Sequence, residues 1–537
     1  MLTRRLQGTG RVGRRTSRTP PTRLPGTPAD DPTGGSPHAG PLTRVPLRAV
    51  RNRPRSVEWV HGLPLGVPRP ERPVRLADLA GRRVGVWGHG REGRAAVRAA
   101  VAAGAAGIVV VDAVPPAPEE LPPDAQVGTD AVALAGCDVV LRSPGISPYR
   151  EDAQALAAGT RVTSGTAVAL AEFTARSVPT LCVTGTKGKS TTSALAAAVL
   201  PAAGRPAVHA GNIGTPLLDV LLDGAVGDAT SLVVEVSSYQ AAAVDDFTGW
   251  GAVTSLSPEH LDWHRSVEAY YRDKLHVFAG CGPGSVVVGA QARPIAERHL
   301  DPAVLVDPAD VVPPAVLDGF HPAHLPGAHN LANVHVALAA CVRMGVDLDR
   351  SADAVRAAVA GFRALPHRLS PVATRDGVTF VDDTLSTTPV SVLAALDAHA
   401  GRAVTLLAGG QDRGLDHTDL ARAVVARGGA VRVVTVPDTG ARLAAGIRAE
   451  AARAGVDAPV TETASLEEAV AEALRTTPPG AVVLLSPGAP SYNRFRNYEE
   501  LARTYEQILA AAGAERLGAG RLGAGPLGAG RLGAGRT

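Results

Sequence analysis

Lysine is almost absent from this chain of 537 residues. Of its 54 basic residues only three are lysines, Lys187, Lys189 and Lys274, and all the others are arginines. A lysine kept against this bias is expected where a compact ammonium group, or a primary amine with an adjustable pKa, does what a guanidinium cannot. The three lysines are therefore candidate functional residues.

Cysteine, aromatic residues and long apolar runs are also scarce. The four cysteines show no C-x-x-C spacing and no histidine at metal-ligand spacing, which argues against a disulfide framework and against a structural zinc site. No run of eighteen apolar residues could span a bilayer, and the Arg-rich start lacks the apolar core of a signal peptide. We therefore expect a cytoplasmic protein without a membrane span.

Only the two ends of the chain carry a net positive charge. Residues 1–57 hold twelve Arg against two Asp, whereas acidic residues outnumber basic ones by 49 to 38 between residues 58 and 515. The acidic body does not indicate nucleic-acid binding. The segment 1–57, rich in Arg, Pro, Thr and Gly, is predicted to be disordered. The tail 513–537 contains a repeated RLGAG unit and is predicted to have no structure.

Between these ends, three blocks alternate short β-branched runs with helical stretches, the pattern of parallel α/β sheets. A chain of this length favours about three domains. The blocks begin with the runs RRVGVW (82–87), TLCVTG (180–185) and GVTFVDD (377–383). The sequence therefore predicts an α/β protein with three domains, at 80–175, 176–368 and 369–512.

The segment LCVTGTKGKSTTSAL combines an apolar strand, a glycine turn and a helix start, which is the layout of a phosphate-binding loop. Lys189 is expected to contact the β- and γ-phosphates of ATP, and the Ser190 hydroxyl to bind Mg²⁺. Val183 stands where the strict pattern has glycine, so the loop is a shortened form. The predicted ATP-binding residues here are Gly185, Thr186, Lys187, Gly188, Lys189, Ser190 and Thr191.

The segment GHGREG in the first block matches G-x-G-x-x-G, with glycines at 88, 90 and 93 and with Asp112 nineteen residues after Gly93. This spacing is typical of a dinucleotide-binding site, as in a nicotinamide-dependent dehydrogenase. A nucleotide-sugar diphosphate needs the same backbone donors. The motif therefore predicts a diphosphate ligand at Gly88, Gly90, Gly93 and Asp112 without identifying it.

Further polar residues lie where a packing role does not require them. Glu235 ends an apolar run, at the place where carboxylates usually line the ligand crevice of an α/β sheet. The segment PEHLDWH (258–264) could hold a hard cation, although a lone histidine is more often structural. Lys274 lies in a predicted helix, where it is either a surface lysine or a functional one.

In chain order these segments resemble the Mur ligase family, and within it the enzymes that add glutamate to UDP-N-acetylmuramoyl-L-alanine. The resemblance covers about residues 80–512. The matching segments are WGHGREG, SPGISPYR, VTGTKGKSTT, GNIGTPLL, VEVSSYQ, PEHLDWH, DKL, LPGAHNLAN, LPHRL, DDTLSTTP, GGQDRGLD and LLSPGAPSYNRFRNY. The family implies a Rossmann-like UDP-binding domain, a central P-loop ATPase domain and a C-terminal Rossmann-like domain that brings glutamate.

The resemblance also implies roles for individual residues. Glu235 and His260 correspond to ligands of two Mg²⁺ ions together with Ser190, and Lys274 corresponds to a catalytic lysine carried as a carbamate that supports Mg²⁺. Lys189, His260 and Lys274 are the implied catalytic residues. The remaining positions contact ligands: Asn330, Asn333, Arg368 and Asp383 for ATP; Ser143, Asn212 and Ser237 for the UDP substrate; Thr387, Arg413, Ser491 and Tyr498 for glutamate.

The implied reaction activates the alanyl carboxylate with ATP as an acyl phosphate, which the glutamate amine then attacks. This places the protein in peptidoglycan synthesis, and hence in cell wall biogenesis, cell shape and cell division. The form GTKGKS and the sequence DTLST, where D-glutamate-adding enzymes often read DSKAT, resemble the branch that adds L-glutamate and leaves inversion to a partner epimerase. The alternatives are the D-glutamate ligase, a dehydrogenase and a non-catalytic nucleotide-sugar-binding protein.

Overall fold

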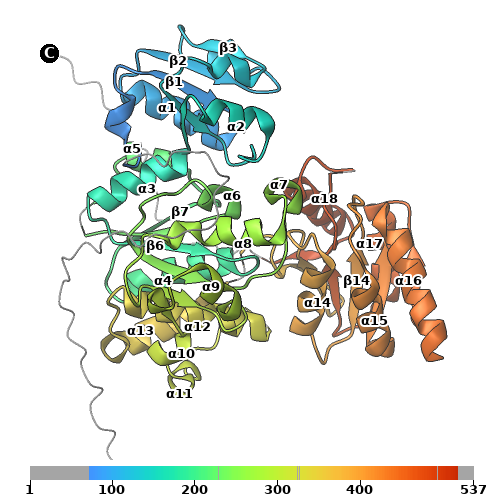
Figure 1. Ribbon diagram of the computed structural model, residues 1–537. Coiled ribbons are helices and arrows are strands. Elements are labelled where there is room, and N and C mark those ends of the chain that lie inside the picture. The colour runs from blue at the N-terminus through green and yellow to red at the C-terminus, as the bar shows by residue number, and fades with distance from the viewer. Residues whose placement is uncertain are drawn as a thin grey trace, which may run out of the picture. The chain divides into compact units, whose positions relative to one another are not determined.

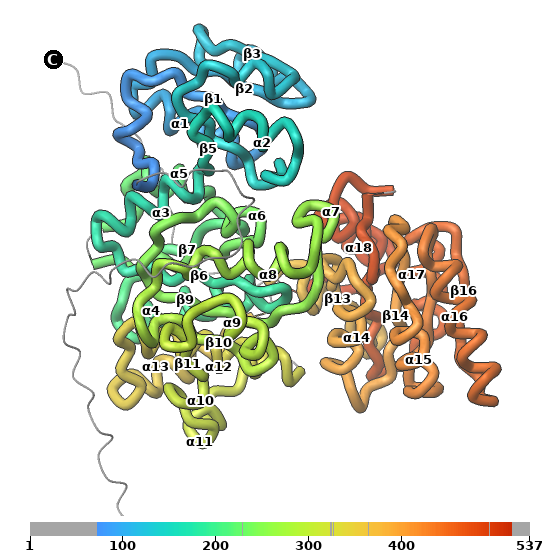
Figure 2. The backbone as a smooth tube through the Cα atoms, viewed as in Figure 1, coloured from blue at the N-terminus to red at the C-terminus, as the bar shows by residue number. Residues whose placement is uncertain are grey.

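The computed structural model describes residues 72–517, apart from 228, 323, 324, 326, 364 and 493. Within these residues it contains three β-sheets with helices packed on them (Figure 1). Each sheet is built from one continuous stretch of the chain, as the colours of Figure 2 show. The predicted three-domain α/β fold is confirmed. The predictions for 1–57, and for the tail beyond residue 517, lie outside the described residues.

The first sheet has parallel strands in the order β3-β2-β1-β4-β5. Its strands are β1 (Arg83–Trp87), β2 (Gly107–Val111), β3 (Gln126–Gly128), β4 (Val139–Arg142) and β5 (Arg161–Thr163). The helices of this part of the chain are α1 (Arg91–Ala102), α2 (Glu151–Ala157) and α3 (Gly165–Ala175). The strand order reverses between β1 and β4, and ligands of open α/β sheets bind at such a point.

The second sheet is also parallel, in the order β11-β10-β9-β6-β8-β7. Its strands are β6 (Thr180–Thr184), β7 (Ala207–Gly211), β8 (Ser231–Glu235), β9 (Trp250–Val253), β10 (Val286–Val288) and β11 (Leu305–Val306). Every residue of β6 and β8 is buried. Such unbroken apolar runs are expected of parallel strands that are covered on both faces.

Helices cover both faces of the second sheet (Figure 1). Leu181 and Val183 pack with helices α4, α12 and α13, whereas Cys182 between them packs with α8. The helices of this region are α4 (Lys189–Ala202), α5 (Leu217–Leu222), α6 (Ser238–Ala241), α7 (Leu261–His264), α8 (Val267–Leu275), α9 (Arg293–His299), α10 (Pro308–Val311), α11 (Pro314–Leu317), α12 (Ala328–Arg343) and α13 (Leu348–Gly361). The alternation along β6 follows from the two-residue period of a strand.

The third sheet has the order β16-β15-β14-β17-β13-β12-β18. Its strands are β12 (Ser370–Arg375), β13 (Val378–Asp382), β14 (Val404–Ala408), β15 (Val431–Thr435), β16 (Val460–Glu462), β17 (Val482–Leu485) and β18 (Glu515–Arg516). Helices α14 (Pro389–Ala398), α15 (Thr418–Ala426) and α16 (Thr439–Ala454) pack on one face, and α17 (Leu466–Thr476) and α18 (Tyr498–Ala511) on the other. The predicted boundaries near 176 and 369 fall between α3 and β6 and between α13 and β12.

The expectation that the tail from residue 513 has no structure is wrong at its start. Glu515 and Arg516 form β18, which pairs antiparallel with Thr374 and Ala373 of β12. β12 is itself antiparallel to β13, so this edge departs from the all-parallel pattern. Glu515 precedes the RLGAG repeat and Arg516 begins it, so two residues at this point show no periodicity of their own, and pairing with the open edge of β12 gives them partners.

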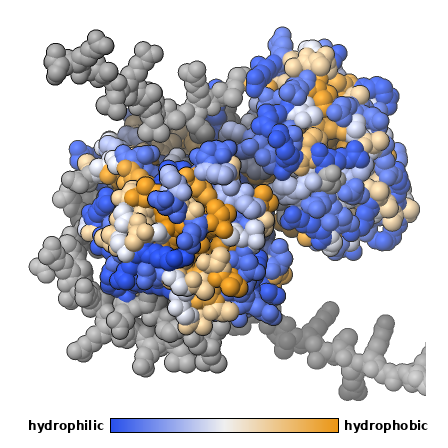
Figure 3. Space-filling view, turned by 90° about the horizontal axis from the view of Figure 1, so that it is seen from above, coloured by the Kyte–Doolittle hydropathy of each residue, from blue (hydrophilic) through white to orange (hydrophobic). Residues whose placement is uncertain are grey.

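The face seen in Figure 3 carries both polar and apolar areas. Large apolar side chains that are exposed in the first-sheet region are Val101, Val114, Val127 and Val132. No helix among the described residues has both the length and the apolar character needed to cross a membrane.

Candidate functional site

The glycine turn after β6 is the first part of the candidate site. β6 ends at Thr184 and α4 begins at Lys189, so residues 185–188 form the connection. Gly188 has a φ of +90°, and a Cβ there would lie 2.3 Å from Oδ1 of Asn333. Glycine is therefore required for both conformational and steric reasons. A glycine turn that leads from a buried parallel strand into a helix binds phosphate through backbone N–H groups.

Two of the three lysines converge on this turn. Lys189 donates from Nζ to the carbonyl oxygens of Gly185 at 2.9 Å and Thr186 at 3.0 Å. Lys274, on α8, donates from Nζ to the same Gly185 oxygen at 2.9 Å. The lysine of the predicted phosphate loop and the lysine predicted to carry a carbamate thus lie side by side, although 85 residues separate them in the chain.

Burial makes both amines less basic. It lowers the pKa of Lys189, and burial together with the ammonium group of Lys189 lowers the pKa of Lys274 well below its ordinary value. The Lys274 side chain is 2% exposed and contacts the Gly185 carbonyl and the ring of Tyr270, 4.9 Å away, rather than a carboxylate. The shift is toward the neutral amine, which is the nucleophilic form of a lysine.

The third lysine is paired with an acid. Nζ of Lys187 lies 2.8 Å from Oε1 of Glu259, whose other oxygen lies 3.8 Å from Nε2 of His260. Burial, reinforced by the neighbouring lysine ammonium groups, lowers the pKa of His260 despite the pull of Glu259 in the opposite direction. The imidazole is therefore neutral near pH 7, as a metal ligand must be.

Glu235 supplies a buried carboxylate at the carboxyl end of β8. The residue is 1% exposed, and its Oε1 accepts a hydrogen bond from Nδ2 of Asn212 at 2.7 Å. Its Oε2 has no hydrogen-bond partner among the described residues. A buried, unpaired carboxylate oxygen is unfavourable unless a cation or a donor compensates it.

The four predicted Mg²⁺ ligands are Ser190, Glu235, His260 and Lys274. In the described part of the chain no three His, Cys, Asp or Glu side chains gather closely enough to hold a metal by themselves. Mg²⁺ at nucleotide sites usually takes one or two carboxylates together with phosphate oxygens and water. The unpaired oxygen of Glu235 and the neutral imidazole of His260 fit that requirement.

The other predicted ATP-binding residues lie around the same turn. Asn330 and Asn333 lie on α12, with the amide of Asn333 donating to Oδ1 of Asn330 at 3.3 Å. The guanidinium of Arg368 donates to Oγ of Ser190 at 3.1 Å, and Thr191 is buried in the first turn of α4. Residues from three distant segments therefore meet at the start of α4.

Asp383 lies beside this group and supports it. Its carboxylate accepts hydrogen bonds from the Leu369 N–H at 3.1 Å and from Oγ of Ser486 at 2.7 Å. Burial nevertheless outweighs these bonds and raises the pKa of Asp383 to about 6. In this structure Asp383 holds the backbone at Leu369, next to Arg368.

A cavity of about 550 Å³ opens beside the first sheet. Six of the seven residues predicted to bind the UDP substrate line it: Gly88, Gly90, Asp112, Ser143, Asn212 and Ser237. The seventh, Gly93, lies behind the wall, where a Cβ would be 1.8 Å from the carbonyl oxygen of Gly88. Its role is to let helix α1 approach the turn closely.

Several of these lining residues are already bonded to the protein. The Asp112 carboxylate accepts from the N–H groups of His89 at 2.6 Å and Val114 at 3.1 Å, and the Ser143 hydroxyl donates to the Gly88 carbonyl at 2.9 Å. They shape the glycine turn. Asn212 bonds Glu235, so the cavity wall and the candidate metal ligand are directly connected.

The predicted glutamate-binding residues follow neighbouring strands of the third sheet. Thr387 follows β13, Arg413 follows β14, and Ser491 and Tyr498 follow β17. β17 pairs with both β13 and β14, so the three carboxyl ends lie side by side at the edge where ligands of α/β sheets bind. None of the contacts of the described residues joins these four side chains directly to one another.

Their individual contacts differ. The Arg413 guanidinium lies over the ring of Tyr492, 5.9 Å from its centre. Tyr498 packs edge-on against His367, with ring centres 5.4 Å apart. Ser491 lines a small second cavity of about 30 Å³ together with Gly410. Thr387 is half-buried.

Sequence reasoning left the role of His264 open, and it missed several residues of the site. His264 is fully buried, with its two ring nitrogens near Asp273 and Ser238, so it is not available to a metal ion in this arrangement. Gln240 and Tyr239 line the cavity. Their segment VEVSSYQ contains a serine N-cap followed three residues later by Gln, which signals the start of helix α6 but not its ligand.

Comparisons with known proteins match the regions of the second and third sheets. A family model described as the Mur ligase middle domain matches residues 183–303, and one described as the Mur ligase glutamate ligase domain matches residues 367–488. The chain is 43% identical to the UDP-N-acetylmuramoyl-L-alanine–L-glutamate ligase of Micromonospora sp., with 81% of this chain and 98% of that protein covered. The enzyme of the same name from Salinispora tropica is also 43% identical, with 81% and 99% covered.

More distant proteins show a similar coverage. The L-glutamate ligase of Xanthomonas axonopodis pv. citri is 40% identical, with 81% of this chain and 96% of that protein covered. The solved structure of the MurF ligase of Thermotoga maritima in complex with ADP is 14% identical, covers 81% of this chain and 99% of that one, and has a TM-score of 0.49.

Proposed function

This chain belongs to the Mur ligase family, and from that premise we propose that it joins L-glutamate to UDP-N-acetylmuramoyl-L-alanine at the expense of ATP. The observation that carries the proposal is the convergence of Lys189 and Lys274 on the Gly185 carbonyl. The two lysines lie at the glycine turn of residues 185–188. The buried carboxylate of Glu235 accepts a hydrogen bond from Asn212, which lines the cavity of about 550 Å³.

ATP is assigned to the turn of residues 185–191. When the γ-phosphate binds, the Lys189 ammonium group exchanges two neutral carbonyl acceptors for charged phosphate oxygens. Hydrogen bonds between two ionised groups are stronger than those to a neutral acceptor. Asn330, Asn333, Arg368 and Asp383 surround the start of α4 and are proposed to hold the rest of the nucleotide. In the cavity, Gly88, Gly90, Asp112, Ser143, Asn212 and Ser237 are proposed to hold the UDP substrate.

Lys274 is proposed to carry a carbamate. The bond forms between a neutral amine and carbon dioxide, and one proton is released. Burial without a carboxylate partner favours the required neutral amine. The product is an anion next to Lys189, so the modification gives the Lys189 ammonium group a charge partner of opposite sign.

Glu235, His260, Ser190 and the modified Lys274 are proposed to hold two Mg²⁺ ions, which would neutralise part of the charge of the phosphate groups. The chain's own contribution is to keep these ligands in place. Asn212 fixes one oxygen of Glu235 and leaves the other free. The neutral state of His260 leaves a nitrogen lone pair for coordination.

The proposed chemistry has two steps. An oxygen of the alanyl carboxylate attacks the γ-phosphorus, and the bond from that phosphorus to the bridging oxygen of ADP breaks, which gives an acyl phosphate. The glutamate amine then attacks the carbonyl carbon, loses a proton and expels phosphate, which forms the amide. Lys189 stabilises charge on the transferred group, and enclosure of the site excludes water from the acyl phosphate.

L-Glutamate is favoured over D-glutamate by two considerations. The curated relatives that are 38–43% identical carry the L-glutamate name, and the segment from Asp383 to Thr387 reads DTLST. Thr387, Arg413, Ser491 and Tyr498 are proposed to grip the amino acid. Arg413 suits a carboxylate because its planar fork donates two parallel hydrogen bonds. The pathway would then need an epimerase that inverts the added residue, and the reaction would take place in the cytoplasm.

The test is phosphate release from ATP with both other substrates, with either one alone and with neither. We expect release only when both UDP-N-acetylmuramoyl-L-alanine and glutamate are present, and a loss of about 10²–10³-fold in kcat for Lys189→Ala. Full activity of Lys189→Ala, or a requirement for a nicotinamide cofactor, would instead favour the dehydrogenase alternative. Ligand binding without phosphate release would favour the non-catalytic one.

A further inference from the structure

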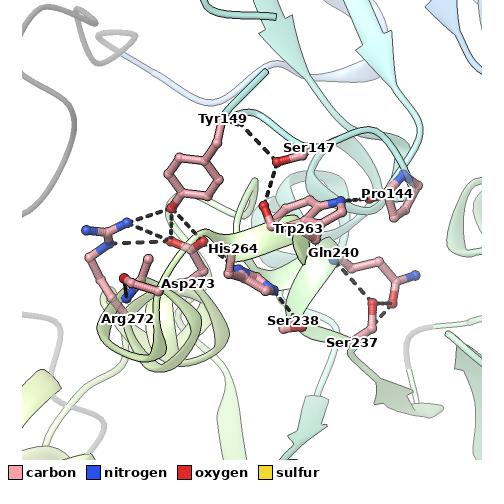
Figure 4. A network of polar contacts seen from close by, with 12 residues as sticks. Pro144, Ser147, Tyr149, Ser237, Ser238, Gln240, Trp263, His264, Arg272 and Asp273 are labelled. Atoms are coloured by element: carbon pink, nitrogen blue, oxygen red, sulfur yellow. Dashed lines mark hydrogen bonds and ion pairs between the residues drawn. The ribbon is translucent and has the colours of Figure 1, made fainter. Parts of the chain in front are cut away.

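A polar network joins Tyr149 to helices α6, α7 and α8 (Figure 4). At its centre, Nδ1 of His264 lies 2.8 Å from Oδ2 of Asp273, and Nε2 lies 3.0 Å from Oγ of Ser238. The Tyr149 hydroxyl lies 2.8 and 2.6 Å from the two Asp273 oxygens, and Arg272 donates to that hydroxyl at 2.6 Å. We call these five residues the His264 network.

One arm of the network comes from the cavity wall beside the first sheet. Residues 143–146 and Arg150 line the cavity, whereas Ser147 and Tyr149 point toward Trp263 and Asp273 (Figure 4). The Ser147 hydroxyl donates to the Trp263 carbonyl at 2.7 Å. The segment thus presents some of its side chains to the ligand space and others to the network.

A second arm comes from helix α6. Ser238 bonds His264, and its neighbours Ser237 and Tyr239 both line the cavity. The ring of Tyr239 is stacked on Trp263, with centres 4.7 Å apart, and lies 4.9 Å from the ring of His260. A ligand that presses on either wall of the cavity therefore also acts on the network.

The other end of the network is the helix that carries Lys274. Asp273 and Lys274 are adjacent on α8, and Lys274 contacts the Gly185 carbonyl of the phosphate-binding turn. Because a helix moves as a unit, a shift of Asp273 also shifts Lys274. His264 is likewise joined to His260 through the single turn of α7.

The network is polar where an apolar core could have held the same segments together. The side chains of His264 and Asp273 are 0% and 9% exposed, and each has its polar atoms bonded. A buried network with all its partners in place accepts only one arrangement of its segments, because a displaced donor or acceptor is left unpaired.

We propose that His264, Asp273 and Tyr149 are positioning residues that couple the substrate cavity to the phosphate-binding turn. Filling the cavity fixes the segment 143–150 and helix α6, and the network then fixes α8 with Lys274 at Gly185. This rests on the proposed function, because it takes the cavity ligand to be the UDP substrate and the ligand of the turn to be ATP. Coupling between two sites is reciprocal, so each ligand raises the affinity for the other by the same factor.

The test uses calorimetric titration of the full chain with a non-hydrolysable ATP analogue and Mg²⁺, with and without saturating UDP-N-acetylmuramoyl-L-alanine. In the wild type we expect the substrate to tighten analogue binding at least about fivefold. Tyr149→Phe removes one hydroxyl and keeps the ring against Trp263, and Asp273→Asn removes the charge. In both variants the substrate should tighten analogue binding by less than about twofold. The affinity for each ligand alone should change by less than about twofold.

Tyr271→Phe is the matched control, because it removes a hydroxyl from the same helix outside the His264 network and should keep the wild-type factor. The proposal is overturned if the wild type shows no coupling, or if Tyr149→Phe and Asp273→Asn both keep the full factor. Equal loss of coupling in Tyr271→Phe would also overturn it, since the effect would then be a general loosening of α8. A wild-type protein that binds neither ligand alone would instead contradict the proposed function.

Discussion

At the scale of single residues, the site depends on charged groups that are buried without their usual partners. Lys274 contacts a carbonyl and an aromatic ring, and Glu235 has an oxygen with no hydrogen-bond partner in the described residues. Groups of this kind destabilise a fold unless a ligand or a modification compensates them. Their placement around one glycine turn is therefore evidence of function rather than of packing.

Substitution of Lys274 tests the carbamate. Lys274→Ala should lower kcat by about 10²–10³-fold, because the removed group would stabilise charge in the transition state. Short carboxylic acids such as formate or acetate should restore part of the activity, since they can place a carboxylate in the vacated space. Phosphate release measured against carboxylate concentration checks this.

Two variants serve as comparisons for this experiment. Lys189→Ala should not respond to carboxylates, because it lacks a cation rather than an anion. Lys274→Arg should be inactive, since a guanidinium does not form a stable carbamate under these conditions. A fully active Lys274→Arg protein would count decisively against the modification.

Asp383 gives a prediction about stability and pH. Its pKa is about 6 in the folded protein, above the ordinary value of 3.8, because burial disfavours its charge. The unfolded chain therefore releases the proton first, and the stability contributed by the neutral form is lost as pH rises from about 4 to above 6. Relative to Asp383→Asn, the wild type should lose on the order of 2 kcal/mol across this window.

Thermal midpoints of the two proteins, measured side by side from pH 3.5 to pH 7.5, check this prediction. The asparagine can still accept from the Leu369 N–H and bond Ser486, so the main difference is the ionisation. The midpoint difference should grow in favour of Asp383→Asn as pH rises. A difference that stays constant across the range would show that the Asp383 carboxyl titrates as it does in the unfolded chain.

At the scale of elements, the close approach of helix α1 to strand β1 depends on Gly93, which has no side chain. A Cβ at Gly93 would lie 1.8 Å from the Gly88 carbonyl oxygen, so the helix or the glycine turn must move to admit it. Gly93→Ala should therefore lower stability by roughly 2–3 kcal/mol and weaken binding of the UDP substrate.

Gly107→Ala, in β2 of the same sheet, is the control for this change. A Cβ there meets no atom within 4 Å, so its stability should stay within about 0.5 kcal/mol of wild type. Denaturant unfolding followed by circular dichroism compares the three proteins. Equal stability of Gly93→Ala and wild type would mean that the close approach of α1 does not constrain the sheet.

The regular elements were predictable from the sequence wherever their signal is local. The β6 run, the glycine turn and the start of α4 at Lys189 lie where the pattern of apolar residues and glycines indicates. β18 was not predictable, because Glu515 and Arg516 form a strand only through pairing with β12. A strand whose only support is a distant edge leaves no periodicity in its own sequence.

The candidate site also has one part that local sequence signals predict and another part that depends on distant contacts. The scarcity of lysine pointed to Lys189 and Lys274, and the glycine spacing pointed to the turn that borders the cavity. The bond between Tyr149 and Asp273 could not be foreseen, since 124 residues separate them and the segments SPGISPYR and DKL that contain them do not indicate that these two side chains meet. Long-range polar contacts depend on how the sheets pack, which local patterns do not encode.

At the scale of the whole molecule, three sheets contribute different parts of one proposed reaction. The first provides most of the cavity, the second the turn proposed to bind phosphate with Lys189 and Lys274, and the third the residues proposed to hold glutamate. Arg368 connects the second and third, because it lies just before β12 and donates to Ser190. Each part alone has several possible functions, and their combination in one chain supports ATP-dependent amide formation.

The most direct test of this account is to identify the product. The purified protein is incubated with ATP, Mg²⁺, UDP-N-acetylmuramoyl-L-alanine and either L- or D-glutamate, and the nucleotide product and released phosphate are quantified by mass spectrometry and a phosphate assay. We predict one phosphate for each UDP-N-acetylmuramoyl-L-alanyl-glutamate formed, with L-glutamate turned over faster than D-glutamate. Faster turnover of D-glutamate would contradict the proposed branch, and phosphate release without the amide product would contradict the central claim.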